Sequence, residues 1–465
     1  MQKALQAIEN TRSELIQLSD TIWGFAETSL KEYRSADASR DYLASKGFRI
    51  EENVAGVPTA FTATWGSGKP VIGFLAEYDA LPGLSNLPAS SKKEPLKEGA
   101  PGHGCGHNLL GVACVGAVLG LKAEMEAGKL PGTIVYFGCP AEENYSAKAM
   151  MAKHGCFKDV DIALAYHPGS KNVVQLNSSN ANNSLKFTYH GRTAHAGGDP
   201  HNGRSALDAV ELMDVGSNYL REHVITQARI HYVITEGGMA PNIVPDRAQV
   251  WYFVRAPQVQ VLRDIVERVK KIAHGAAMMT ETEVDILLES GVYNTLPNEV
   301  VSQVMQEALL AVGPEPWDAA DLKFAAELSA NVDPEERKTK AAMMKIDPNV
   351  PLLSKVEEPS GKGTSMAGST DVADTSWNCP TCTFGTVTNP WVIPGHSWMI
   401  TSSSASSIGH KGMIYAAKAM AVAGLRFIQD ESLVKAAKAE FIKATEGTVY
   451  ESFLQHPYPV FPREG

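Results

Sequence analysis

The sequence predicts an α/β protein in which a mainly parallel sheet forms one domain and a smaller βαββαβ unit is inserted into it. Three observations support this fold class. Short apolar runs between residues 71 and 166 each end in polar residues. A separate pattern of strands and helices occupies residues 184–290. The length of 465 residues exceeds what a single core usually holds. We therefore expect residues 1–183 and 291–465 to form one split domain around an inserted domain at 184–290.

Three apolar runs are typical of strands buried inside a parallel sheet. Each run leads into carboxylates or a histidine: residues 71–76 are followed by Glu77 and Asp79, residues 133–137 by Glu142 and Glu143, and residues 161–166 by His167. The carboxyl ends of parallel strands meet at one edge of the sheet, so these side chains are expected to converge. Convergent carboxylates and imidazoles indicate a metal site.

A glycine-rich turn supplies further candidate ligands. Residues 102–108 read Gly-His-Gly-Cys-Gly-His-Asn, and the glycines let the backbone curl so that Cys105 and His107 can face one point. A thiolate and an imidazole suit a softer divalent ion such as zinc. The alternative is a buried cysteine beside a surface histidine, and the polar residues after the three strands argue against it.

Several motifs occur in the order typical of one enzyme family. They are Asp-Ala-Leu-Pro at 79–82, Cys-Gly-His at 105–107, Pro-Ala-Glu-Glu at 140–143, Ala-Tyr-His-Pro at 165–168 and Gly-Arg-Thr-Ala-His-Ala at 191–196. The chain thus resembles the M20 metallopeptidases, and among them the amidohydrolases with a cysteine in the metal motif. The resemblance covers nearly the whole chain. It implies a split metallopeptidase catalytic domain and an inserted ferredoxin-like lid that also makes the dimer contact.

The resemblance also implies roles for individual residues. Two divalent ions, Zn²⁺ or Mn²⁺, would be bound by Cys105, His107, Glu143, His167 and His396. Glu142 would be the general base, which accepts a proton from the attacking water and passes it to the leaving nitrogen. Asp79 would orient a ligand without binding metal itself. Cysteine favours zinc, whereas relatives of the favoured subfamily are associated with manganese.

The last metal ligand has two candidates. His396 lies in Pro-Gly-His-Ser-Trp at 394–398, which is similar to the late histidine motif of the family. His410 stands at the start of an apolar helix expected over 411–427, where a capping or core role explains it. We predict that His396 is the ligand and keep His410 as its rival.

The inserted segment shows the order strand, helix, strand, strand, helix, strand. The expected elements span 185–189, 205–222, 228–235, 249–255, 259–278 and 284–288, which is the ferredoxin-like pattern. By resemblance, His195 would stabilise the oxyanion of the tetrahedral intermediate, from its own or the neighbouring subunit. Asn242 and Arg255 would grip a substrate carboxylate. For Arg255, a surface residue at a strand end is the alternative.

Composition and local patterns limit the remaining possibilities. The net charge of −10 argues against nucleic acid or an anionic membrane as the main partner. The first ten residues lack the apolar core of a secretory signal, and six cysteines do not make a disulfide framework, so we expect a cytoplasmic protein. Cys379 and Cys382 form a lone CxxC, for which a loop between buried elements is the favoured interpretation. The polar segment 313–368 is expected to form surface excursions with short helices near the site mouth.

The implied activity is hydrolysis of the amide between an acyl or aryl group and an amino acid. The favoured reaction converts p-aminobenzoyl-glutamate into p-aminobenzoate and glutamate. A broader N-acyl-amino-acid hydrolase or a dipeptidase is the alternative enzyme. The partner would be a second copy bound through the lid, or a related subunit in a hetero-oligomer. The alternative that is not an enzyme is a metal-binding regulatory subunit of a hetero-oligomer. The retention of Glu142 together with every candidate ligand argues against it.

Overall fold

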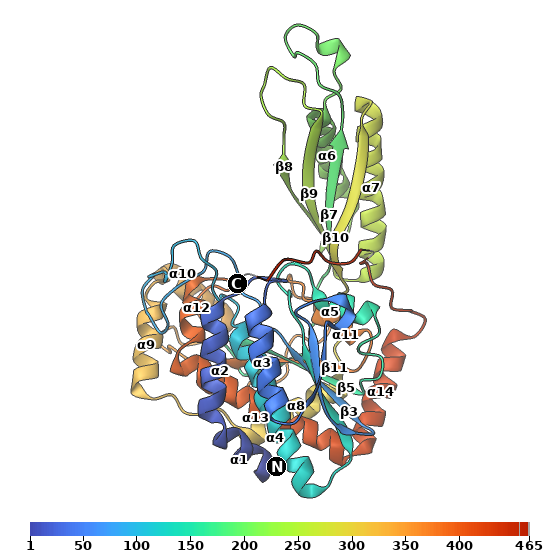
Figure 1. The fold of residues 1–465 in the computed structure, drawn as a ribbon. Helices are drawn as coiled ribbons and strands as arrows, with labels where there is room; N and C mark the ends of the chain where they lie inside the picture. Colours follow the sequence, from blue (N-terminus) through green and yellow to red (C-terminus); the bar gives the residue numbers. More distant parts are fainter. Residues whose placement is uncertain (455, 464–465) are drawn as a thin grey trace.

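The computed structural model describes residues 1–454 and 456–463, and the chain is built around two sheets (Figure 1). The predicted segment 291–465 also includes residue 455 and residues 464–465, which lie outside the described residues. The strands of the larger sheet are β1 Arg49–Glu52, β2 Phe61–Ser67, β3 Val71–Ala76, β4 Gly132–Gly138, β5 Ile162–Gly169, β6 Val173–Gln175 and β11 Thr381–Val387. Their order across the sheet is β1-β2-β4-β3-β5-β11-β6.

The centre of the larger sheet is parallel and its edges are antiparallel. Strands β4, β3, β5 and β11 run in one direction, whereas β1, β2 and β6 pair antiparallel with their neighbours. The three apolar runs noted in the sequence fall in β3, β4 and β5. Their carboxyl ends therefore lie side by side, because a parallel pair needs a long crossover that returns the chain to the same starting edge.

Helices cover both faces of this sheet. Those whose buried side chains join the main core are α1 Gln2–Asn10, α2 Arg12–Phe25, α3 Tyr33–Ser45, α4 His107–Gly128, α8 Glu299–Val312, α13 Ser407–Gln429 and α14 Glu431–Thr445. The short helices α5 Ala147–Lys153 and α11 Val372–Ser376 contribute to the core on the opposite face. Among the described helices, α4 is long and apolar enough to cross a membrane, but 83% of its most apolar window is buried in the protein. It is therefore a core helix of this fold.

The inserted segment forms the smaller sheet. Its elements are β7 Ala181–His190, α6 Ala206–Leu220, β8 Arg229–Glu236, β9 Arg247–Ala256, α7 Val259–Thr280 and β10 Glu283–Val292. The strands are all antiparallel, in the order β10-β7-β9-β8, and both helices pack on one face. Figure 1 shows this unit standing above the larger one. The predicted α/β class is confirmed, and the domain limits at 183/184 and 290/291 stay a prediction.

Two smaller expectations have different outcomes. The segment after α8 contains the helices α9 Ala319–Ser329 and α10 Pro334–Met344, followed by irregular chain that bridges to the end of the larger sheet, as at Gln175 and Ser360. The prediction of a loop around the Cys379–Cys382 motif is wrong at Cys382. This residue lies inside β11, and its buried side chain joins the main core, while Cys379 is buried just before the strand. Cys382 packs in the main core and Cys379 in the core on the opposite face of the sheet, so the two side chains lie in separate hydrophobic cores.

The contact between α13 and β11 depends on a glycine. A Cβ atom at Gly412 would lie 2.3 Å from the backbone oxygen of Val387. We predict that Gly412→Ala lowers the free energy of unfolding by about 1–3 kcal/mol, because the helix must move away from the strand. The matched control is Gly24→Ala in α2, where a Cβ would meet nothing within 4 Å. Denaturant midpoints measure both variants, and equal midpoints would contradict the prediction.

Candidate metal centre

The carboxyl edge of the central strands gathers the predicted ligands. Glu77 and Asp79 follow β3, Glu142 and Glu143 follow β4, and His167 lies near the end of β5. Three overlapping groups each place their ligand atoms within 4.8 Å of one another: Cys105, His107 and His167; Cys105, Glu143 and His396; and Glu77, His107 and Glu142. These are the side chains that could hold divalent ions.

Backbone conformation explains how the Cys105 turn reaches this edge. Gly106 precedes α4 with φ 79°, a left-handed conformation that glycine adopts without steric cost. The turn thereby puts Cys105 Sγ 3.4 Å from His167 Nε2. His103, in the same turn, is directed elsewhere, and its Nε2 lies 3.1 Å from the backbone oxygen of Ile22.

Asp79 fixes the orientation of His107. Its Oδ1 lies 2.8 Å from His107 Nδ1, while its Oδ2 accepts hydrogen bonds from Ser29 Oγ and the Glu143 backbone, each at 3.0 Å. Burial opposes ionisation of this carboxyl, but His107 and the hydrogen bonds lower its pKa. The contact leaves His107 Nε2 facing the cluster, which is the arrangement expected of a carboxylate that orients a metal ligand.

A buried ion triad beside the cluster was not anticipated from the sequence. Lys148 Nζ lies 2.6 Å from both Glu77 Oε1 and Asp371 Oδ1, and all three side chains are buried. Burial works against the charge on the lysine, but the two carboxylates raise its pKa well above the usual range. Glu77 could be noticed as a residue after a strand, whereas nothing in the sequence around Lys148 or Asp371 indicates that they meet.

Several buried polar atoms of the cluster form no hydrogen bond. His107 Nε2, Glu77 Oε2 and Glu143 Oε1 are buried without a hydrogen bond within the described protein. Burial raises the pKa of Glu142 well above normal, and the neighbouring Glu77 and Glu143 raise it further. Burial also raises the pKa of the Cys105 thiol to about 12. Buried polar atoms are normally satisfied, and a cation favours the ionised forms of these groups, so the donor set fits divalent metal ions.

The two histidines proposed for the last position differ in their surroundings. His396 Nε2 lies 3.6 Å from Glu143 Oε2, inside one of the three ligand groups. His410 Nε2 instead lies 2.8 Å from Asp20 Oδ1, against helix α2. The structure thus brings His396 to the cluster and leaves His410 outside it.

A cavity of about 450 Å³ opens over the cluster and reaches the inserted unit. Its lining includes Arg255 of β9, Gln175 of β6, and Met366, Ser369 and Thr370, which precede α11. The segment that was expected near the site mouth therefore does reach it, through Met366. Of the substrate-binding residues proposed for the lid, Arg255 is the one at this cavity.

His195 and Asn242 lie far from the cluster in the same chain. Arg255 is paired with Asn182 near the start of β7, whereas Arg247 is paired with His190 at its end. These pairs are separated by eight residues, or ~25–30 Å of strand. His195 follows that distant end and is exposed, with Nδ1 accepting hydrogen bonds from Gly197 and Gly198.

Asn242 is next to His195, because its backbone oxygen accepts a hydrogen bond from Ala196. The structure therefore separates the three lid residues into two places. His195 and Asn242 lie together at the tip of the inserted unit, whereas Arg255 lies at its base. Within one chain, Asn242 and Arg255 do not grip the same carboxylate.

Comparison with known proteins agrees with the fold. The chain is 38% identical over 458 residues to a p-aminobenzoyl-glutamate hydrolase subunit of Escherichia coli (strain K12), covering 96% of this chain and 95% of that protein. It is 30% identical over 319 residues to Xaa-Arg dipeptidase of Mus musculus, covering 66% of this chain and 70% of that protein. Residues 179–277 match the model described as the M20 peptidase dimerisation domain.

A solved structure shows the same fold. The structure of a dinuclear metal-binding peptidase of the M20 family from Bacillus subtilis superposes with a TM-score of 0.55 at 16% identity, covering 90% of this chain and 99% of that one. The relative at 38% identity spans nearly the whole chain and decides the family. The chain therefore belongs to the M20 family of metal-dependent hydrolases.

Proposed function

We propose that the protein is a dinuclear-metal amidohydrolase that cleaves p-aminobenzoyl-glutamate to p-aminobenzoate and glutamate. One observation carries the proposal: three overlapping groups of metal-ligand atoms lie next to a buried glutamate, in a cavity whose rim bears an arginine. The Escherichia coli relative, which is named as a subunit of p-aminobenzoyl-glutamate hydrolase, supports this substrate. The proposed location is the cytoplasm.

The proposed ligands of the two ions are Cys105, His107, Glu143, His167 and His396. The contact between Asp79 and His107 supports a role for Asp79 in orienting that ligand. Zinc and manganese are both compatible with the set, since the thiolate suits zinc and the carboxylates suit manganese. When bound, two such ions would activate a water and polarise the scissile carbonyl.

Glu142 is proposed to move the proton. Glu142 is buried beside Glu77 and His107, and burial favours its neutral form. Nearby cations would ionise this carboxyl, and the ionised Glu142 would then readily take up a proton. Once protonated, it can deliver that proton to the amine that leaves as glutamate. The adjacent Glu143, within 4.8 Å of Cys105 and His396, is better placed to bind metal than to carry a proton.

The lid residues are proposed to act between two copies of the chain. His195 and Asn242 are too far from the cluster of their own chain, by ~25–30 Å of strand. A homodimer formed through residues 184–290 would let each copy present them to the other, so that His195 stabilises the oxyanion and Asn242 binds substrate. Arg255 would bind a substrate carboxylate at the site of its own chain.

A dipeptidase is the second candidate, supported by the relative named Xaa-Arg dipeptidase. If that substrate released arginine here, its side chain would approach Arg255 at the cavity rim. Like charges repel, whereas glutamate brings carboxylates to the same place. The basic rim therefore favours an anionic product.

The first prediction concerns the substrate. Purified protein, alone and loaded with Zn²⁺ or Mn²⁺ in parallel, is expected to release glutamate from p-aminobenzoyl-glutamate with a kcat/KM at least about tenfold above those for N-acetyl amino acids and p-aminobenzoyl-arginine. Chelation should abolish the release and metal should restore it. Bound metal without turnover of any substrate would contradict the proposal and favour a subunit that requires a catalytic partner.

The second prediction separates the adjacent glutamates. Glu142→Gln should keep its metal and lose about 10²–10⁴-fold in kcat, because the proton carrier is removed. Glu143→Gln should instead lower the metal content, because a ligand is removed. Metal analysis of both variants beside their kinetics is the measurement. Loss of metal from Glu142→Gln with retention in Glu143→Gln would mean that the two roles are reversed.

The third prediction tests the exchange of lid residues. Glu142→Gln and His195→Ala should each be nearly inactive alone. Dimers from their coexpression should recover about one quarter of the wild-type rate, because half of the dimers are mixed and hold one complete site. If both single variants are inactive and the mixed dimers are no more active, His195 acts in the site of its own chain. An active His195→Ala variant would place His195 outside catalysis.

A further inference from the structure

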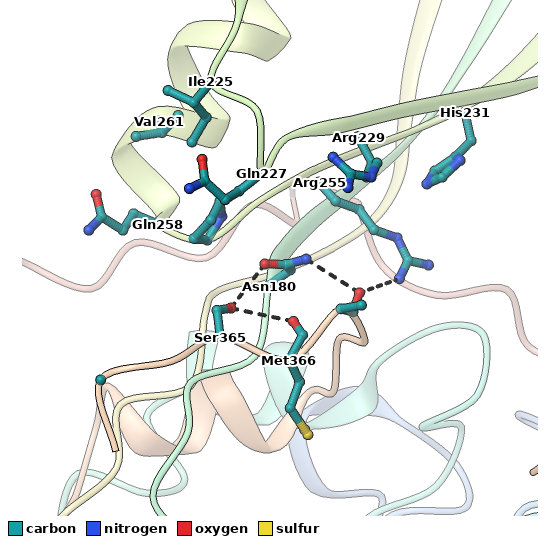
Figure 2. A pocket seen from close by; sticks show the side chains of 13 residues that line it. Asn180, Ile225, Gln227, Arg229, His231, Arg255, Gln258, Val261, Ser365 and Met366 are labelled. Atoms are coloured by element: carbon teal, nitrogen blue, oxygen red, sulfur yellow. Dashed lines mark hydrogen bonds between the residues drawn. The ribbon is translucent and has the colours of Figure 1, made fainter. Parts of the chain in front are cut away.

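A second cavity lies where the inserted unit meets the rest of the chain (Figure 2). Its volume of about 830 Å³ falls within the range of roughly 300–1,000 Å³ that is usual for ligand pockets. It is bordered by the starts of β8 and α7, the end of β9 and the segment around Ser365. Arg255 and Met366 line both this cavity and the metal cavity, so the two are neighbours.

The wall of this second cavity is basic. Arg229 of β8 and Arg255 of β9 are directly paired across the strands, and His231 follows on the same face of β8. Figure 2 shows the two arginine side chains next to each other, with His231 beyond them. Burial lowers the pKa of His231, and the positive charges of Arg255, Arg221 and Arg229 lower it further. The arginines thus create a positive field at this wall.

No described carboxylate neutralises these two arginines. Arg229 donates to the backbone oxygens of Thr226 and Ala228, at 2.6 and 2.7 Å. The one described acceptor of Arg255 is the backbone oxygen of Ala367 at 3.4 Å, and its Nε is buried without a partner. Like charges directly opposite on neighbouring strands are destabilising. An anion between the guanidinium groups would remove that repulsion and supply the missing acceptor.

Neutral amides complete the lining. Gln227 and Gln258 approach from the side of the helices, and Asn180 lies below them (Figure 2). Asn180 is already committed, because it accepts from Ser365 Oγ at 3.0 Å and donates to Ala367 at 3.3 Å. It thereby holds the segment that separates the two cavities. The amides of Gln227 and Gln258 can donate hydrogen bonds to a carboxylate, whereas the described lining offers no acid to a cation.

We propose that this cavity is a subsite for an anionic extension on the amino-acid side of the substrate. The ligand class is an acyl-amino acid whose amino-acid part carries further carboxylates, such as a chain of γ-linked glutamates. The proposal rests on the proposed function, because Arg255 would hold the first carboxylate at the wall shared with the metal cavity. Arg229 and the glutamines would then receive the groups beyond it. The volume exceeds the needs of one carboxylate, which favours an extended chain.

The experiment compares three substrates that differ only in this extension: p-aminobenzoyl-alanine, p-aminobenzoyl-glutamate and p-aminobenzoyl-γ-diglutamate. In the wild type, kcat/KM should rise along the series. Arg229→Gln should lower the ratio of kcat/KM for the diglutamate to that for the alanine substrate by about ten- to a hundredfold, because one charged hydrogen-bonding group is lost. An unchanged ratio, whether or not overall activity falls, would overturn the proposal.

The matched control is Arg268→Gln. Arg268 lies on α7 of the same unit and outside the cavity lining, and it donates to the backbone oxygen of His223. This variant removes the same charge from the unit, so a long-range electrostatic effect would appear in it as well. The substrate ratio should stay at the wild-type value. A fall equal to that of Arg229→Gln would also overturn the proposal.

A binding measurement separates this proposal from the proposed function. Calorimetric titration with γ-glutamyl-glutamate, which has no acyl group to cleave, should show binding to the wild type and at least about tenfold weaker binding to Arg229→Gln. If none of the three substrates is hydrolysed but the dipeptide binds in this way, the proposed reaction is rejected and the subsite is kept. No binding of the dipeptide, or inorganic phosphate binding as tightly as the dipeptide, would reject the subsite.

Discussion

The structure depends on one constraint: charged side chains are crowded away from water at the carboxyl edge of four parallel strands. A buried charge costs several kcal/mol unless a partner compensates it. Part of the compensation is built into the chain, through Lys148 between Glu77 and Asp371 and through the contact between Asp79 and His107. The remaining buried polar atoms of the cluster form no hydrogen bond within the described protein. Divalent ions would complete the compensation, so the same crowding that costs stability also prepares the metal centre.

The fixed pairs also set the geometry for chemistry. Lys148 is buried on α5, just after the loop that carries Glu142, and it holds one oxygen of Glu77 while the other oxygen faces His107. Asp79 binds both His107 and the backbone of Glu143, so one carboxylate aligns two candidate ligands. Rigid ligands lose little conformational freedom when metal binds. Glu142 lies beside Glu77 and His107, which is the position that the proposed role as proton carrier requires.

The inserted unit joins this centre at one end and extends away from it at the other. At the near end, Arg255 belongs to both cavities, so the lid contributes positive charge where an amide of glutamate would be held. At the far end, His195 and Asn242 are presented outward. One long strand pair, β7 with β9, connects the two ends. The unit therefore presents one end to the site of its own chain and the other end outward, as the proposed exchange between two copies requires.

Local patterns in the sequence determined the strands that end at the site, the ferredoxin-like order of elements and the candidacy of Cys105 and His107, because periodicity, glycine turns and neighbouring ligand types act over short stretches. Only the tertiary structure decided that Lys148 belongs to the charged cluster and that Asn242 and Arg255 lie at opposite ends of the lid. Those facts depend on which distant segments pack together and on which groups are thereby removed from water. Burial and through-space charge are properties of the packed chain, so they leave no local mark in the sequence.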